Sequence, residues 1–111
     1  MTSYETGHQA EARAARFLVR QGFAVRELNW KTRFCEIDIV AEKGSCIYFV
    51  EVKYRSSTQW GAGLEYITAK KLKQMRFAAS YWLARHDWHQ QSCLAALSID
   101  GNIFRLEMLT D

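Results

Sequence analysis

The chain has 111 residues, of which 49% are apolar and 14% aromatic, and its formal net charge is +3. This balance excludes a disordered chain and fits a single domain over residues 1–111. No apolar run approaches the roughly 18 residues that a membrane span needs, and the N-terminal residues lack the apolar segment of a signal peptide. We therefore expect a cytoplasmic protein without membrane contact.

The first half of the chain predicts a helix followed by three strands. Apolar residues recur at helical spacing over residues 4–21, and the glycine that follows, Gly22, is a typical helix end. Stretches rich in β-branched and aromatic residues predict strands over residues 23–30, 34–41 and 46–55. A tight turn at Lys43-Gly44 would join the last two strands as an antiparallel hairpin.

The second half predicts one more helix and two more strands. The helix covers residues 66–86, the strands cover 93–99 and 102–109, and Asp100-Gly101-Asn102 is a typical hairpin turn. The order is αβββαββ. A helix between two strands makes those strands parallel with a right-handed crossover, whereas short links make the other neighbours antiparallel. The expected fold is therefore α/β, a mixed five-stranded sheet flanked by helices.

Four charged residues on the second and third predicted strands are candidates for chemistry. Glu36 and Asp38 belong to the second strand, and Glu51 and Lys53 belong to the third. Because side chains alternate along a strand, the two members of each pair share a face of the sheet. The turn between the strands decides whether these two faces coincide.

A two-residue turn at Lys43-Gly44 would place both pairs on the same face. Counting back from this turn puts Glu36 opposite Glu51. In the same register, Asp38 falls opposite Phe49. Opposite residues point to the same side of an antiparallel pair, so all four charged side chains would gather on one face of the hairpin.

Three carboxylates and one ammonium group in this arrangement have two interpretations. One is a Mg2+ site, because buried carboxylates need a cation and Mg2+ often takes only one or two of them. The lysine would then polarise the attacking water or stabilise charge that develops on a phosphate oxygen. The other is a solvated face of the sheet, on which Lys53 simply neutralises Glu51 or Glu36.

Asp38 followed by the triplet Glu51-Val52-Lys53 resembles the signature of the PD-(D/E)XK nuclease superfamily. The core order of that superfamily, αβββαβ, is similar to the order predicted here. The resemblance implies a restriction-endonuclease-like fold with a metal site at these residues.

A more extensive resemblance is to the bacterial YraN-like family, which has a predicted endonuclease fold and is similar to archaeal Holliday-junction resolvases. The matching positions span most of the chain; they are Gly7, Glu11, Asn29-Trp30, residues 36–40, residues 49–53, Arg55, Glu65 and Lys71. One departure is Cys35, since the family usually has glycine before the Glu-Ile-Asp segment. A glycine there would allow a close backbone approach or a strained turn.

The resemblance implies a role for each matching site residue. Asp38 and Glu51 would hold Mg2+, or Mn2+ in its place, and the main-chain carbonyl of Val52 would be a third oxygen ligand. Lys53 would position or activate the water. Glu11 would be an outer or second-metal ligand, although its spacing alone fits an exposed helix carboxylate paired with an arginine equally well.

Basic residues flank the acidic strands, and we expect them to contact the phosphates of a nucleic acid. The candidates are Arg26, Lys31, Arg33, Arg55, Lys70 and Lys71. For the lysines the alternative is an ordinary solvated helix face, although cations are favoured at the opposite end of a helix. Trp60 could stack on a base or pack against the second helix.

Three functions are compatible with the sequence. The first is a Mg2+-dependent endonuclease acting on DNA, including branched or junction DNA, as a homodimer if it cuts two strands. The second is a nucleic-acid-binding module that keeps the nuclease fold without significant catalysis. The third is a protein-interaction module that pairs through the edge strand over residues 102–109.

Overall fold

The computed structural model describes the chain in two parts, residues 3–55 and 67–109, with side chains described from residue 9 to 54 and from 67 to 109. Trp60 and Glu65 lie outside the described residues. The elements are α1 (Ser3–Arg20), β1 (Ala24–Lys31), β2 (Glu36–Lys43), β3 (Cys46–Arg55), α2 (Ala69–His86), β4 (Gln91–Asp100) and β5 (Ile103–Leu109). Neither described helix combines the length and hydrophobicity needed to cross a membrane.

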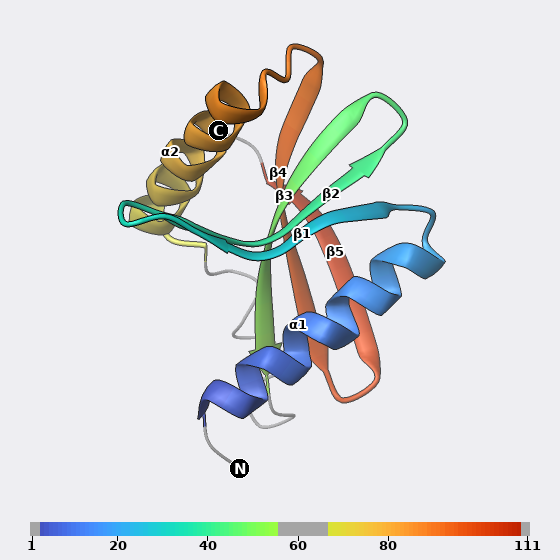
Figure 1. Ribbon diagram of the computed structural model, residues 1–111. Helices are drawn as coiled ribbons and strands as arrows, with labels where there is room; N and C mark the ends of the chain where they lie inside the picture. Colours follow the sequence, from blue (N-terminus) through green and yellow to red (C-terminus); the bar gives the residue numbers. More distant parts are fainter. Residues whose placement is uncertain (1–2, 56–66, 110–111) are drawn as a thin grey trace.

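The five strands form one mixed sheet in the order β1-β2-β3-β4-β5 (Figure 1). β3 and β4 are parallel because α2 connects them, and every other neighbouring pair is antiparallel. This arrangement confirms the predicted αβββαββ order and the α/β fold class.

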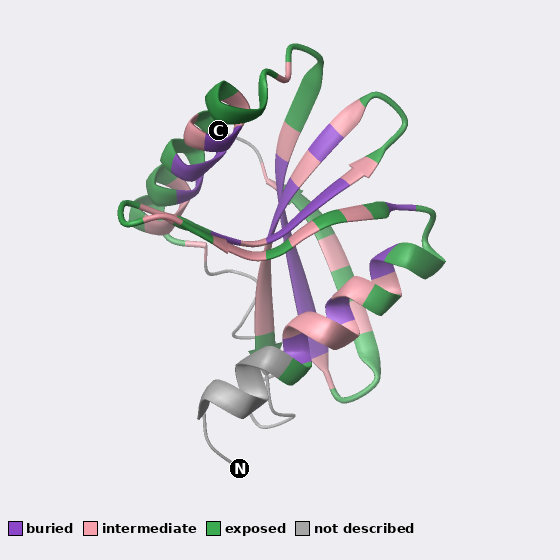
Figure 2. Cartoon of the chain, in the orientation of Figure 1, coloured by how far each residue is buried: buried purple, intermediate pink, exposed green. Residues whose placement is uncertain are grey.

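Two hydrophobic cores hold the helices on opposite faces of the sheet, and the buried positions follow the inner faces of the helices and the central strands (Figure 2). Under α1, Leu18 packs in the same cluster as Val50. Under α2, the rings of Trp82 and Phe49 meet edge to face with centroids 5.6 Å apart. Neighbouring residues of β3 therefore serve different cores, since side chains alternate along a strand.

The turn between β2 and β3 lies one residue later than the sequence predicts. Lys43 pairs with Cys46, so the turn consists of Gly44 and Ser45. Gly44 has a left-handed φ of 63°, which glycine adopts without strain. Lys43 remains in the strand, where its ammonium group donates a hydrogen bond to the carbonyl of Gln21 at 2.9 Å.

The later turn changes the register of the hairpin by two residues. Phe49 faces Val40 rather than Asp38, so the predicted partners were wrong. Extending the observed register by one residue brings Asp38, not Glu36, level with Glu51. A shift of two residues keeps the alternation of side chains, so Asp38 still takes the same face as Glu51.

β2 twists away from β3 at Asp38. The paired residues end at Ile39 and Val50, and in Figure 1 the far ends of β1 and β2 curve toward α2. Ile37 packs in the core under α2 whereas Ile39 packs in the core under α1, although residues two apart in a regular strand share a face. Beside this point on β1, Asn29 has a φ of 52°, which is uncommon outside glycine.

Candidate functional site

Polar side chains meet where β2 and β3 diverge. The backbone N–H of Val52 donates a hydrogen bond to Asp38 Oδ2 at 2.8 Å, so the carboxylate takes the place of a strand partner. Glu51 Oε2 lies 3.5 Å from Lys53 Nζ and 3.2 Å from Lys71 Nζ. We call Asp38, Glu51, Lys53 and Lys71 the acidic site.

The environment of Asp38 disfavours its charged form. Burial, and after it the nearby Glu51 carboxylate, raise the pKa of this carboxyl from 3.8 to about 7, while the hydrogen bond from the Val52 N–H acts in the opposite direction. A carboxyl with this pKa is close to half ionised at neutral pH. For Asp38, the loss of solvation on burial therefore outweighs the stabilisation of the charged form by its neighbours. A pKa raised in this way is typical of functional carboxylates.

A small cavity is lined by both carboxylates. It has a volume of about 10 Å3, enough for one water-sized sphere, and Asp38 and Glu51 line it together with the apolar side chains of Met75 and Ala78 from α2. The N–H and C=O of one strand residue point to the same edge of the strand, so the Val52 carbonyl is directed to the side where its N–H meets Asp38.

The oxygen atoms at this cavity are of the kind that a hard divalent cation takes. Mg2+ keeps several waters and takes one or two carboxylates, whereas zinc is usually bound by three or four protein ligands, mostly nitrogen and sulfur. Within residues 3–55 and 67–109 no three His, Cys, Asp or Glu side chains converge on one point. Asp38, Glu51 and the Val52 carbonyl would supply oxygen ligands of the kind that Mg2+ or Mn2+ takes.

Two further acidic residues were predicted near this site. The charge of Glu11, on α1, contributes to the raised pKa of Asp38, although less than burial and Glu51 do. This places Glu11 near the site. Glu36 is exposed and lines the rim of the cavity, but the corrected register does not pair it with Glu51.

The predicted basic residues separate into four groups, of which Arg26 is the last. Lys71 contacts Glu51 directly, and so belongs to the acidic site itself. Lys31, Arg33 and Lys70 are exposed around the β1–β2 turn and the first turn of α2. Arg55 ends β3, and its side chain lies outside the described residues.

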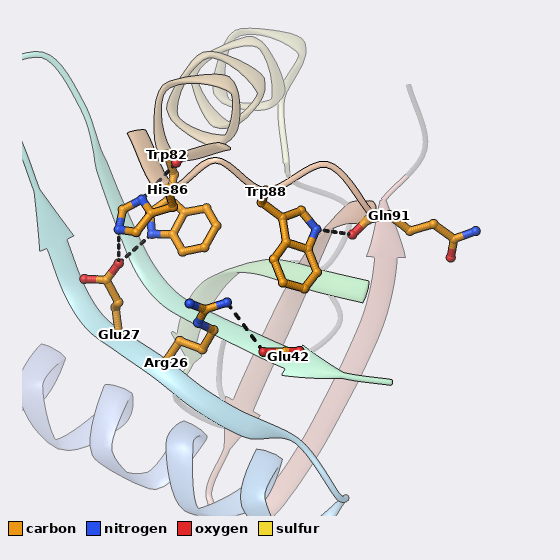
Figure 3. Close-up of polar contacts among 7 residues, drawn as sticks. All are labelled: Arg26, Glu27, Glu42, Trp82, His86, Trp88 and Gln91. Carbon is orange, nitrogen blue, oxygen red and sulfur yellow. Dashed lines mark hydrogen bonds and ion pairs between the residues drawn. The ribbon is translucent and has the colours of Figure 1, made fainter. Parts of the chain in front are cut away.

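Arg26 is not brought to the acidic site. It lies beside the other end of α2, where its guanidinium forms an ion pair with Glu42 at 3.5 Å and sits over the rings of Trp82 and Trp88 (Figure 3). Sequence reasoning placed it among the phosphate contacts because only its position along β1 was visible. Its neighbours in the fold indicate a structural contact instead.

A second polar cluster surrounds Arg26 and was not expected from the sequence. Glu27 Oε2 accepts a hydrogen bond from the buried indole N–H of Trp82 at 2.5 Å and lies 3.3 Å from Nε2 of His86 (Figure 3). The rings of Trp82 and His86 are stacked with centroids 4.0 Å apart. We call Arg26, Glu27, Glu42, Trp82, His86 and Trp88 the tryptophan cluster.

Cys35 stands where the family usually has glycine, and its backbone is not strained there. It closes the β1–β2 turn, where its N–H and that of Phe34 both donate hydrogen bonds to Thr32 Oγ1, at 3.2 and 3.0 Å. Its φ is not in the left-handed region that would require glycine. The departure from the family pattern therefore leaves the fold intact.

Comparison with known proteins assigns the chain to a family. The model of the uncharacterised protein family UPF0102 matches residues 10–101. A UPF0102 protein of Pseudomonas fluorescens is 36% identical over 107 residues, covering 95% of this chain and 89% of that protein. A UPF0102 protein of Shewanella loihica is 37% identical over 105 residues, covering 92% of each.

A solved structure has a similar fold. It is Hjc of Archaeoglobus fulgidus, a Holliday junction resolvase from an archaeal hyperthermophile, with a TM-score of 0.62 and 21% sequence identity. The similar region covers 91% of this chain and 75% of that protein. The likeness bears out the restriction-endonuclease-like fold.

Proposed function

The chain belongs to the UPF0102 family, and we propose that it is a metal-dependent nuclease that hydrolyses phosphodiester bonds in DNA. The observation that carries this proposal is the meeting of Asp38, Glu51 and Lys53 on one side of the sheet where β2 leaves β3. The fold shared with a Holliday junction resolvase supports it.

In this proposal the two carboxylates hold the metal ion, Mg2+ or Mn2+, together with the Val52 carbonyl. When bound, the ion supplies Lewis-acid polarisation of the scissile phosphate. Lys53 donates a hydrogen bond to the attacking water or to a phosphate oxygen, and Lys71 presents a second ammonium group on the same side. One well-placed donor of this kind is commonly worth about 10²–10³ in rate.

A nucleic-acid-binding module without significant catalysis is the second candidate. The observation that favours it is that Lys53 and Lys71 both contact Glu51, so this carboxylate has two cationic partners in the absence of a metal ion. If these lysines neutralise the carboxylate, the protein would keep its fold and its basic surface without needing Mg2+.

The test is a cleavage assay with purified full-length protein on a panel of linear, nicked, single-stranded and four-way-junction DNAs, with Mg2+ or Mn2+ titrated. We expect metal-dependent cleavage of at least one substrate and none with Asp38→Ala purified in parallel, which excludes a contaminating nuclease. DNA binding without cleavage of any substrate would favour the binding module.

Branched DNA and a dimeric assembly are finer parts of the same proposal. The structural neighbour is named for its action on Holliday junctions, and cutting two strands of a junction requires two active sites. β5 is one of the two edge strands of the described sheet, and its Ile103 and Met108 side chains are 56% and 49% exposed. We propose that two copies pair through this strand. Sedimentation of wild type and of Ile103→Lys measures the oligomeric state directly.

A further inference from the structure

A groove beside the acidic site combines aromatic and basic side chains. It has a volume of about 640 Å3 and runs between the β1–β2 turn and the first half of α2. The residues that line it are Phe34, Cys35, Glu36, Lys70, Lys71, Lys73, Gln74, Met75 and Phe77. The sequence singled out two of these lysines but neither phenylalanine.

The two phenylalanines are exposed where burial would be expected. Phe34 is 63% exposed and Phe77 is 53% exposed, and both rings lie 6.2 Å, centroid to centroid, from the ring of Tyr81. The guanidinium of Arg33 lies over the Phe34 ring at 5.4 Å, and that of Arg85 over Tyr81 at 5.7 Å. Flat apolar surfaces flanked by cations are therefore presented to solvent beside the groove.

The charge of the groove selects a polyanion. Three lysines line it against one carboxylate, that of Glu36. One of these lysines, Lys71, is engaged by Glu51 of the acidic site. Lys70 and Lys73 are exposed and available to phosphates.

The groove is continuous with the acidic site. Glu36 and Met75 line both the groove and the small cavity lined by the carboxylates, and Lys71 joins the two. Phe34 is only two residues from Glu36, at most about 7 Å along the chain. A nucleic acid strand whose phosphate is at the acidic site therefore passes close to the aromatic rings.

We propose that this groove binds an unpaired stretch of nucleic acid strand, with bases stacked on Phe34 and Phe77 and phosphates on Lys70 and Lys73. In a continuous duplex both faces of each base are covered by neighbouring bases, so exposed rings can stack only on bases that are single-stranded, splayed or flipped. The inference rests on the proposed nuclease function. It adds that the substrate is a DNA with unpaired bases beside the bond that is cleaved.

The experiment measures binding without cleavage, so that the two proposals fail separately. Full-length protein in EDTA is titrated into a fluorescent mixed-sequence single-stranded DNA, the same sequence as RNA, and a blunt duplex. The test variant is Phe34→Ala with Phe77→Ala; the control is Val19→Ala with Leu28→Ala, which removes two comparably exposed apolar side chains that do not line the groove.

We expect the wild type to bind the single strand at least about tenfold more tightly than the duplex. Each stacked ring contributes about 5- to 150-fold, so the test variant should lose at least about tenfold for the single strand and nothing for the duplex. The control should behave as wild type. The fluorescence of 2-aminopurine placed in the single strand should be quenched on binding to wild type and not on binding to the test variant.

Equal binding of single strand and duplex, or an unchanged single-strand affinity in the test variant, would overturn the inference even if the protein cleaves DNA. Loss of single-strand binding in the test variant supports it even if no cleavage is ever found. Stronger binding of the DNA or of the RNA single strand identifies which nucleic acid the groove accepts, and either result supports the stacking.

Discussion

The two ends of α2 carry polar clusters of opposite character. In the tryptophan cluster, each charged group has close partners: Glu27 accepts from Trp82 and lies beside His86, and Arg26 pairs with Glu42 over indole rings (Figure 3). In the acidic site, burial and a second carboxylate raise the pKa of Asp38 to about 7.

We infer that the charges of the tryptophan cluster hold the fold, whereas those of the acidic site are placed for a ligand. Buried polar groups stabilise a protein only when they are paired, whereas a carboxyl with a raised pKa costs stability until a cation or proton relieves it. The tryptophan cluster anchors β1 and β2 to the end of α2. The acidic site is the part of the sheet at which we expect chemistry.

The strongest test of this contrast is catalytic. Lys53→Ala should reduce the rate of metal-dependent cleavage by at least about 100-fold, because it removes a donor to the reacting phosphate or water, while DNA binding stays nearly intact. Glu27→Gln, at the other end of α2, should leave cleavage unchanged. A Lys53→Ala variant that cuts as fast as wild type would show that the acidic site is wrongly assigned.

The stability of the fold, unlike cleavage, should be sensitive to a substitution in the tryptophan cluster. Glu27→Ala leaves the fully buried indole N–H of Trp82 without its acceptor and should lower the free energy of unfolding by about 1–3 kcal/mol, measured by urea denaturation. Glu107→Ala, an exposed site on β5, is the matched control and should change little. Equal stability of the two variants would mean that the tryptophan cluster does not anchor the fold.

The pKa of Asp38 predicts that its removal stabilises the protein at high pH. Because this pKa is raised from 3.8 to about 7, the folded protein holds a proton that the unfolded chain releases, and stability falls as the pH rises through this range. Asp38→Asn keeps an oxygen for the Val52 N–H without the charge. It should be more stable than wild type at pH 8 by about 1–2 kcal/mol, after allowance for solvent screening.

The comparison of wild type with Asp38→Asn also tests metal binding. The advantage of Asp38→Asn should disappear near pH 4, and Mg2+ at pH 8 should raise the melting temperature of wild type but not of the variant. A variant that is less stable than wild type at pH 8 in EDTA would contradict the account of Asp38 as a strained carboxylate.

The smallest expected effect concerns the basic surface next to the acidic site. Lys70→Gln with Lys73→Gln should reduce the log–log slope of single-strand binding against salt by about 1.4, since two phosphate contacts of about 0.7 each are lost. Arg16→Gln with Arg20→Gln removes the same charge from the exposed surface of α1. If both pairs change the slope equally, the DNA does not follow the groove.

The sequence alone determined the order of the elements and which strand residues meet at the proposed metal site, because both depend on local signals. Alternation along β2 and β3 was enough to place Asp38, Glu51 and Lys53 on one side, and a register error of two residues did not change that result. The turn itself was misplaced by one residue, because Gly44 was assigned to its second position when the backbone uses it at the first.

Only the tertiary structure decided what the remaining charged and aromatic residues do. Arg26 and Lys71 look alike as basic residues in the sequence, yet one packs on tryptophan rings and the other contacts Glu51. Phe34 and Phe77 are 43 positions apart and come together because the β1–β2 turn reaches α2. Local patterns specify which face a side chain takes, but contacts between distant segments depend on how β2 twists away from β3, which no short stretch of sequence encodes.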